Sequence, residues 1–361
     1  MKILFGADLV PTSASEQLFV EKDFKALFGK VLDIIPEYDR FVVNFECTLT
    51  TCENQIKKYG PALKAHPSVA DSLKELGVTD VMLSNNHVFD FGIKGLRDTM
   101  DNFNRVGIPF TGIGENDQDS RKLYYIEQDG KKICIVNVCE HEYSYATANR
   151  VGCNPYVPFE TMRDIKKAKE NADFVVVIYH GGKEYCRYPS PRLREHCREM
   201  VLNGANVVLT QHSHCVGCYE EYEGGHIVYG QGNLHFVTNS RYPEWYTSLI
   251  VGIEFTDKVK MSFYPTYQTE VGIELAEGEK RDEIISGFEK RNAELKDGSW
   301  INGWDDFCNR IANDYKYCMS AEYEKDFGKE MGDQVKAHYL DCEAHLDVIK
   351  HIFKSWNYTN K

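Results

Sequence analysis

Five short apolar runs in this chain are each followed by residues whose side chains bind metal ions. In chain order, these polar segments are Gly6 to Asp8, Asn44 to Glu46, Asn85 to His87, His180 to Gly182 and His212 to His214. The runs that precede them are typical of buried strands. Because parallel strands end at one edge of a sheet, the pattern predicts an α/β (α+β) fold that gathers carboxylate, amide and imidazole groups at that edge. Such a set of groups suits two divalent cations.

The length and the charge of the chain limit the class of protein to which it can belong. Its 361 residues can bury a large core, in one domain or in a domain with an appendage. The formal net charge of -13 argues against nucleic acid and anionic membranes as partners, since both favour Lys and Arg. We expect an anionic small molecule, peptide or polymer as substrate, if bound metals supply positive charge. No segment has the length of a signal-peptide core or a spanning helix, so we expect a cytoplasmic protein. Nothing in the sequence indicates the oligomeric state.

The twelve cysteines are scattered along the chain. Only Cys215 and Cys218 have Cys-x-x-Cys spacing, and the second pair of a zinc ribbon is missing. In a reducing compartment we expect free thiols. A redox or ligand role for Cys215, next to His214, is the alternative.

Strand-like and helix-like segments alternate up to about residue 210. Helical periodicity predicts helices over residues 24–35, 68–76, 95–106, 161–170 and 191–202. The Asp129-Gly130 pair predicts a hairpin between two strands. Strands are expected over residues 122–127, 132–138, 225–229, 247–255 and 258–264. Mixed sheets flanked by helices are the architecture that this alternation favours.

From about residue 271 the sequence becomes rich in Glu and Lys and helical in pattern. We therefore divide the chain into a main domain, residues 1–270, and a helical C-terminal extension, residues 271–361. Helices are expected over residues 281–294, 304–323 and 334–354. We expect the extension to pack against the main domain, with a lid or a partner-docking surface as the alternative. The side chains expected at that contact are Trp304, Phe307, Tyr315 and Phe353.

Six motifs resemble, in order, those of the CapA family of bacterial capsule synthesis (poly-γ-glutamate) proteins. They are Gly6-Ala-Asp8, Asn44-Phe-Glu46, Ser84-Asn85-Asn86-His87-Val-Phe-Asp90, His180-Gly-Gly-Lys-Glu184-Tyr185, Gln211-His212-Ser-His214 and Tyr229-Gly-Gln-Gly232-Asn233. That family is similar to the calcineurin-like metallophosphatases, which implies a four-layer αββα sandwich with two metals at the sheet edge. The resemblance covers roughly residues 2–265 and leaves the extension outside it.

The resemblance implies a role for each matching residue. The implied metal ligands are Asp8, Glu46, Asn86, His180, His212 and His214. Glu46 would bridge the two cations. Asp8 and His214 would complete the first metal site. Asn86, His180 and His212 would complete the second. Oxygen and imidazole ligands without thiolate suit Mn²⁺, Fe²⁺ or Zn²⁺.

The residues beside these ligands are implied to act on the substrate. His87 would protonate the leaving group as the catalytic acid, and Asp90 would orient it. The residues implied to contact the substrate or support the ligands are Asn44, Asn85, Glu184, Tyr185 and Asn233. Lys183, Arg187 and Arg192 could attract an anion, although a solvated surface role is the simpler interpretation.

The chain departs from the wider metallophosphatase pattern at its first motif. That pattern has Asp-x-His, whereas this chain has Asp8-Leu9-Val10 and lacks one imidazole. Gln211 and Leu234 also replace the usual glycine and aromatic residue. The first metal site is therefore expected to be poorer in ligands.

Ordinary structural roles are the alternatives for these groups. Asp8 and Glu46 could be capping carboxylates, Asn86 and His87 a hydrogen-bonded turn, and His212 and His214 solvent-exposed side chains. His141 and His235 are expected to be ordinary loop histidines.

Three functions follow from this interpretation. The first is a two-metal hydrolase in which a metal-bridging hydroxide attacks a phosphoester or phosphodiester. The second keeps the metals but acts on an amide or peptide, such as poly-γ-glutamate, by hydrolysis or by epimerisation. The third is a non-catalytic component of capsule-polymer assembly.

Overall fold

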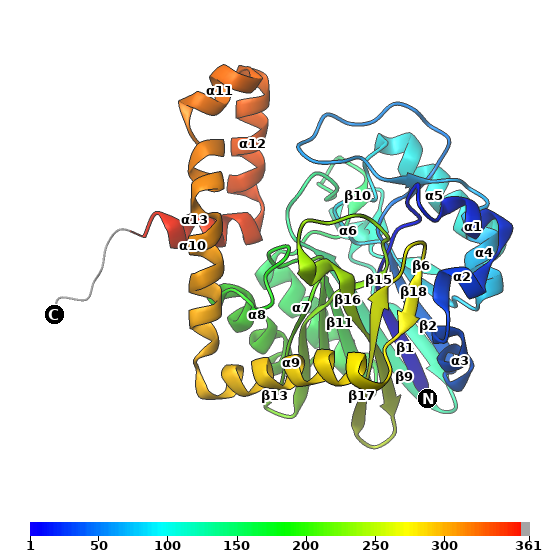
Figure 1. The fold of residues 1–361 in the computed structure, drawn as a ribbon. Helices are drawn as coiled ribbons and strands as arrows, with labels where there is room; N and C mark the ends of the chain where they lie inside the picture. The colour runs from blue at the N-terminus through cyan, green and yellow to red at the C-terminus, as the bar shows by residue number, and fades with distance from the viewer. Residues whose placement is uncertain (355–361) are drawn as a thin grey trace.

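The computed structural model describes residues 1–354, and two large sheets form its centre (Figure 1). The first sheet contains, in spatial order, β18 (Ile273–Leu275), β17 (Val259–Gln268), β16 (Thr247–Phe255), β1 (Lys2–Leu9), β2 (Arg40–Phe45), β5 (Asp80–Met82) and β6 (Phe110–Thr111). A short strand, β15 (Asn233–His235), also pairs with β1. The strands β1, β2, β5 and β6 are parallel, and β16 to β18 continue the sheet in antiparallel fashion.

The second sheet has six strands. In spatial order they are β13 (Val216–Tyr222), β14 (Gly225–Gln231), β12 (Val207–Gln211), β11 (Phe174–His180), β9 (Lys131–Cys139) and β8 (Tyr124–Gln128). The four strands β14, β12, β11 and β9 run parallel. Two short pairs, β3 (Thr48–Leu49) with β4 (Lys64–Ala65) and β7 (Ile113–Gly114) with β10 (Gly152–Cys153), lie outside the sheets.

Three apolar clusters define four layers. Between the two sheets, Phe5 and Val42 of the first pack with Val176 and Leu209 of the second. The outer face of the first sheet is covered by α1 (Glu16–Glu21), α2 (Phe24–Phe28), α3 (Val31–Ile34), α4 (Val69–Leu76) and α5 (Gly92–Val106). The outer face of the second sheet is covered by α7 (Pro158–Asn171), α8 (Pro191–Leu202) and the C-terminal helices. The αββα sandwich expected from the resemblance is confirmed.

Most of the helices expected in the main domain form close to their predicted bounds. The helix expected over residues 24–35 is an exception, because α2, α3 and the 3₁₀ turn η1 (Ile35–Glu37) replace it. The break falls at Gly29, whose φ is 44°. A Cβ at this glycine would lie 2.1 Å from a Glu274 oxygen, so the left-handed backbone and the close contact both require glycine. The remaining short elements are α6 (Asp117–Ser120) and η2 (Pro243–Tyr246).

The described part of the extension, residues 271–354, begins with β18 of the first sheet and then forms five helices rather than three. They are α9 (Gly278–Asp297), α10 (Trp300–Cys318), α11 (Ala321–Phe327), α12 (Lys329–Asp341) and α13 (Glu343–Ile352). In Figure 1, α10, α11 and α12 project beside the main domain as a helical hairpin. Within residues 1–354, no helix is both long enough and apolar enough to span a membrane.

The extension shares a core with the second sheet. Trp304, Phe307 and Tyr315 are buried in the same cluster as Tyr179 of β11. Phe353, which we expected at this contact, is 49% exposed because α13 ends beside it. The buried guanidinium of Arg291 donates to the carbonyl oxygen of Gly217 on β13, 2.8 Å away. The extension is therefore a covering layer of the sandwich, and the boundary at residue 270 stays a prediction.

Substituting Trp304 with alanine is expected to destabilise the whole chain. The side chain is 2% exposed, and truncating a buried Trp typically costs about 3–5 kcal/mol in the free energy of unfolding. Urea unfolding followed by circular dichroism should show one transition at lower urea, with Phe353→Ala as the matched exposed control. Two transitions, of which only one moves in the Trp304 variant, would contradict a shared core.

Candidate metal centre

The predicted metal ligands meet at the carboxyl ends of parallel strands from both sheets. Asp8 lies near the end of β1, opposite Asn44 of β2 in the register of the first sheet. Glu46 follows β2 directly, and Asn86 lies on the loop after β5. His180 ends β11, where it pairs in register with Gln211 at the end of β12. The expectation that these strand ends converge at one edge is confirmed.

The backbone at this edge adopts unusual conformations. Outside glycine, positive φ angles occur in the described chain at six residues, and three of them are Tyr185 (62°), His212 (81°) and His214 (52°). The left-handed region costs an L-residue roughly 1–2 kcal/mol. Strain of this kind concentrates at functional sites, where the surrounding fold holds it. The two histidines of the His-x-His motif are therefore held in place by the backbone as well as by side-chain contacts.

The carboxylate of Glu46 lies at the centre of the cluster. Among the described residues, four groups of three side chains offer ligand atoms that lie within 4.8 Å of one another. Glu46 belongs to two of them, one with Asp8 and His180 and the other with His212 and His214. The resemblance implies that Asp8 and His214 share one site, and His214 Nδ1 also lies 3.4 Å from Asp8 Oδ2. The shared position of Glu46 fits a bridging carboxylate, and the distribution of ligands between two cations stays a prediction.

The residues present fit a cation. Both carboxylate oxygens of Glu46 are buried and have no hydrogen-bond partner within the described residues. A buried ionised carboxylate without a partner is costly, and proteins offset that cost by pairing the charge or by binding a metal. His212 Nδ1 and one oxygen of Glu140 are also buried and have no hydrogen-bond partner within the described residues. Oxygen and imidazole donors together suit Mn²⁺, Fe²⁺ or Zn²⁺.

The pKa values of these groups are shifted strongly. Burial, together with the charge of Asp8, raises the pKa of Glu46 to about 7. Burial lowers the pKa values of His180 and His212 to about 4 each, so both imidazoles are neutral at pH 7 and able to bind a cation. Burial opposes the charging of His214, but Glu46 and Asp8 raise its pKa to about 9. A cation at His214 would therefore displace a proton.

His87 and Asp90 are paired as expected. His87 Nδ1 lies 2.6 Å from Asp90 Oδ2, which leaves Nε2 as the free ring nitrogen. Lys58 was not predicted, yet its Nζ lies 2.6 Å from Asp90 Oδ1 and 3.3 Å from His87 Nδ1. The backbone N–H of Leu63 donates to Asp90 Oδ2 at 2.7 Å. Asp90 is thus held from three sides and fixes the orientation of His87.

Three of the residues expected to contact substrate lie behind the ligands instead. The Asn44 side-chain amide nitrogen lies 2.7 Å from Asp8 Oδ1 and 3.0 Å from His180 Nδ1. Asn85 Nδ2 donates to Asn44 Oδ1 at 3.1 Å. Asn233 Oδ1 accepts from His214 Nδ1 at 2.8 Å. These asparagines are buried, so their contacts are those of positioning residues.

Glu184 and Tyr185, in contrast, line a cavity next to the centre. The Tyr185 ring stacks on Tyr242, with ring centroids 3.9 Å apart. Glu184 lies 3.2 Å from Lys183, and the charge of this lysine opposes the effect of burial and holds the pKa of Glu184 well below its usual range. Both residues are placed where a bound molecule could reach them.

Two acidic residues were missed. Glu140 and Glu142 follow β9, as the predicted ligands follow their own strands. His212 Nε2 lies 3.4 Å from a Glu140 oxygen and 3.5 Å from a Glu142 oxygen. Glu142 Oε2 also accepts from Asn86 Nδ2 at 3.0 Å. The same strand-end rule would have found them, since Cys139 closes an apolar run.

The remaining polar candidates lie outside the centre. His141 pairs with Glu343 of α13 at 2.7 Å. His235 is not on a loop as expected: it is fully buried on β15, and its ring packs against Phe19 and Phe28. Arg192 pairs with Asp347 of α13 at 2.8 Å. These contacts are structural ones.

Of the ordinary alternatives, only the one for Asn86 and His87 describes the structure: both lie in a turn in which the Asp90 N–H donates to the His87 carbonyl oxygen at 3.2 Å. His212 and His214 are 3% and 4% exposed, so the interpretation as solvent-exposed side chains is wrong. Asp8 Oδ2 accepts from the backbone N–H of His212 at 3.0 Å, in the middle of the cluster rather than at a helix N-terminus. The twelve cysteines are free, as expected, and eleven of them are buried.

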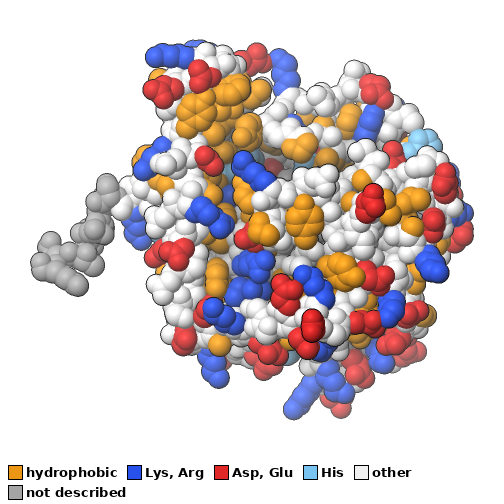
Figure 2. All heavy atoms as spheres, viewed as in Figure 1, with side chains coloured by type: hydrophobic (Ala, Val, Ile, Leu, Met, Phe, Trp, Pro, Cys, Tyr) orange, Lys and Arg blue, Asp and Glu red, His pale blue; other side chains and the backbone are white. Residues whose placement is uncertain are grey.

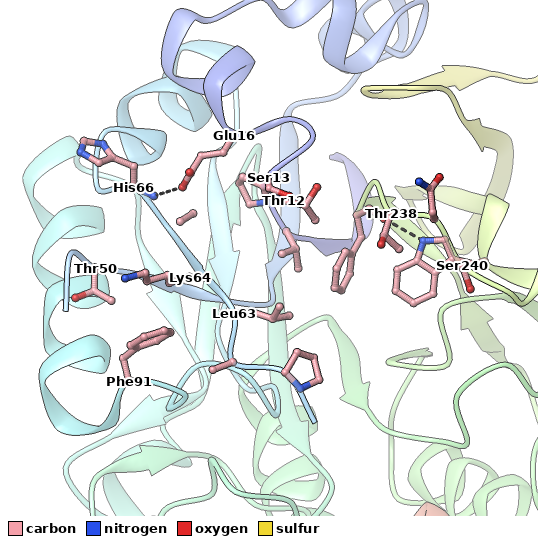
Figure 3. Close-up of a pocket in the computed structure, with 18 of the residues that line it drawn as sticks. Thr12, Ser13, Glu16, Thr50, Leu63, Lys64, His66, Phe91, Thr238 and Ser240 are labelled. Carbon is pink, nitrogen blue, oxygen red and sulfur yellow. Dashed lines mark hydrogen bonds between the residues drawn. The ribbon is translucent and has the colours of Figure 1, made fainter. Parts of the chain in front are cut away.

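Two cavities flank the centre and share Pro61, Tyr185, Arg241 and Tyr242. One, of about 680 Å³, lies between the centre and the extension and is lined by His87 and other residues of both parts. The other has a volume of about 850 Å³. Figure 3 shows three chain segments around this second cavity, marked by Thr12 after β1, Lys64 of β4 and Thr238 after β15. An elongated molecule could therefore extend to either side of the centre.

The fold and the site together define a protein of the αββα class with a buried cluster of metal-ligand residues at the sheet edge. The profile of the family described as "Bacterial capsule synthesis protein PGA_cap" matches residues 2–238, and the chain belongs to this family. The resemblance found in the motifs is confirmed.

Individual relatives are similar over part of their length. The chain is 33% identical to the capsule biosynthesis protein CapA of Bacillus anthracis, over 48% of this chain and 44% of that protein. It is 28% identical to the PGA biosynthesis protein CapA of Bacillus subtilis, over 64% of this chain and 62% of that protein. The chain thus spans less than two-thirds of these curated relatives. The crystal structure of a novel phosphatase from Mycoplasma pneumoniae aligns with a TM-score of 0.44 and 15% identity, over 73% of this chain and 92% of that one.

Removing divalent cations is expected to lower the thermal stability of the protein. A ligand that binds only the folded state stabilises it by roughly 2.7 kcal/mol at 100 times its dissociation constant. Differential scanning calorimetry of metal-free protein, with and without added Mn²⁺, should therefore show a higher midpoint with the cation. An unchanged midpoint at saturating Mn²⁺ and Zn²⁺ would argue against any metal centre.

Proposed function

We propose that this chain is a metal-dependent hydrolase that cleaves a phosphoester or phosphodiester in the synthesis of a capsule polymer. The unpaired, buried carboxylate of Glu46, shared by two groups of ligands, is the observation that supports this proposal best. Two divalent cations, when bound, would supply Lewis acidity, activate water and neutralise a phosphoryl group. The six ligands would hold them.

The residues around the ligands would position the reaction. Asn44 and Asn233 orient the imidazoles of His180 and His214, since hydrogen bonds to the second ring nitrogen fix how a histidine faces a metal. His87, oriented by Asp90, would donate a proton to the leaving oxygen. Lys58, beside both, would place a positive charge where the substrate anion approaches. We propose these roles for the side chains together with an anionic substrate.

A second candidate function uses the same metal centre but cleaves a different kind of bond. Two curated relatives carry the words capsule and PGA biosynthesis in their names. A polymer of glutamate is a chain of amides with free carboxylates, and the two joined cavities offer room for such a chain. The same ligands could then serve hydrolysis or epimerisation at an amide. A non-catalytic role in polymer assembly is the third candidate.

Turnover of an aryl phosphodiester by Mn²⁺-loaded protein tests the first function. We expect Mn²⁺-dependent release of the aryl alcohol that is lost in the metal-free protein and returns on adding the cation. A protein that binds two Mn²⁺ per chain but releases nothing would contradict phosphoester chemistry. Mass spectrometry of a γ-glutamyl peptide incubated with that protein would then distinguish amide cleavage from a role without catalysis.

A further inference from the structure

A second cluster of metal-ligand residues lies in the cavity between the centre and the extension. It joins Glu142, on the loop after β9, to His338 near the end of α12 and His345 in α13. One ligand atom from each of the three side chains lies within 4.8 Å of the other two. Both histidines lie beyond residue 238, where the family match ends. The extension therefore supplies two of the three side chains, and the main domain supplies Glu142.

Each histidine is fixed by its neighbours. The His345 ring stacks on Tyr339, with centroids 4.4 Å apart, and its Nδ1 lies 2.6 Å from the Tyr315 hydroxyl. A ring held through one nitrogen, with the other one free, is the usual arrangement of a metal-binding histidine. His338 stacks on Tyr143 with centroids 5.1 Å apart. The rings of His338 and His345 are themselves 4.6 Å apart.

The third ligand is held against the same helices. His141 donates its backbone N–H to Glu343 Oε2 at 2.7 Å, and its ring pairs with the other oxygen. Glu343 is the first residue of α13, so this contact fixes the loop that carries Glu142. The Cys342 thiol lies 3.9 Å from Glu142 Oε1, so it contacts the carboxylate of the cluster.

The chemistry of the cluster favours one class of cation. His338 and His345 are 9% and 8% exposed, and burial lowers the pKa of both rings, which leaves their nitrogens unprotonated. Two imidazoles and one carboxylate with an open fourth position are a common zinc-binding set. Imidazole ligands also favour Zn²⁺ over the harder Mn²⁺.

We propose that Glu142, His338 and His345 form a further binding site for a divalent cation, with Zn²⁺ as its preferred ion. The site adjoins the centre at Glu46, because Glu142 also lies 3.5 Å from His212 Nε2 and accepts from Asn86 Nδ2 at 3.0 Å. It does not depend on the proposed reaction. A cation there would join α12 and α13 to the loop after β9. It would also place positive charge in the cavity that His87 lines.

Metal content tests this proposal directly. The full-length protein is loaded with Zn²⁺, freed of loosely bound ion by gel filtration and analysed by mass spectrometry of its metals. The variants are His338→Phe, which keeps the aromatic stack on Tyr143, and His345→Gln. The matched control is His351→Gln, a histidine of the same helix α13 that lies outside the cluster and pairs with Asp305. We expect one Zn²⁺ fewer per chain in both variants and no change in the control.

Two results would overturn the site. Equal Zn²⁺ content in all four proteins would show that the cluster holds no ion. Loss of every Zn²⁺ in the folded His338 variant would make the cluster part of the centre at Glu46. X-ray absorption at the zinc edge supplies a second measurement, in which the average number of imidazole ligands should change only in the two cluster variants. Circular dichroism identifies a variant that fails to fold. The other cluster variant, once it is shown to be folded, then decides the test.

Discussion

Glu46→Gln is expected to remove both cations from the centre and to abolish turnover. The glutamate belongs to both ligand groups, and neither of its oxygens has a hydrogen-bond partner among the described residues. A glutamine would direct an amide N–H₂ at one cation and carry no charge. Loss of a residue that only supports a metal ligand weakens metal binding roughly 10–100-fold. Loss of the shared carboxylate itself should therefore weaken metal binding by more than about 100-fold.

Calorimetric titration with Mn²⁺ measures this effect, and metal analysis after gel filtration confirms it. Glu199→Gln, an exposed glutamate on α8, is the matched control and should bind Mn²⁺ as the wild type does. Mn²⁺ is the appropriate probe because the cluster at His345 is proposed to prefer Zn²⁺. Wild-type affinity in the Glu46 variant would show that this carboxylate does not bridge cations, whatever the reaction.

His87→Ala is expected to lower turnover by about 10²–10⁴-fold, the usual contribution of a general acid, while both cations stay bound. His87 is not among the clustered ligands, and its Nδ1 is occupied by Asp90. The measurement is the rate of aryl phosphodiester hydrolysis by Mn²⁺-loaded protein, with the metal content determined on the same sample. His226→Ala, on β14, is the control.

Asp90→Asn extends the test to the orienting residue. It should lower turnover less than the His87 substitution and leave the substrate KM nearly unchanged, because it acts through His87. A wild-type rate in the His87 variant would exclude this residue as the acid. Equally low rates in wild type and variant, with two cations bound to each, would favour a binding role for the protein.

The sequence predicted the site well where the ligands follow buried strands. The apolar run before His180 marks both the strand and the place where it ends, so register and sheet edge follow from local pattern. The loop carrying Glu140 and Glu142 obeyed the same rule. The Asp129-Gly130 hairpin signal marks only the beginning of that strand, whereas the apolar run that closes at Cys139 marks its end.

Other features could not be predicted from local pattern. Lys58 and His345 reach the cavity only through long-range packing, and no spacing in the sequence connects them to His87. The helix expected over residues 24–35 fails because Gly29 adopts a left-handed conformation that periodicity does not report. The roles of Asn44 and Asn85 depend on burial behind the ligands, which a motif does not specify.

The shared core of the extension has a consequence for synthesis of the protein. Tyr229 lies on the outer face of the second sheet. The helical layer that packs on this face includes Tyr339, which is about 110 residues later in the chain. At roughly 5–20 residues per second, a ribosome takes about 5–20 s to make that interval. During this time Tyr179 and its neighbours stay partly uncovered on the nascent chain. Folding of the sandwich must therefore finish after translation of α12. Before that point, the uncovered apolar side chains make the nascent chain most prone to aggregation.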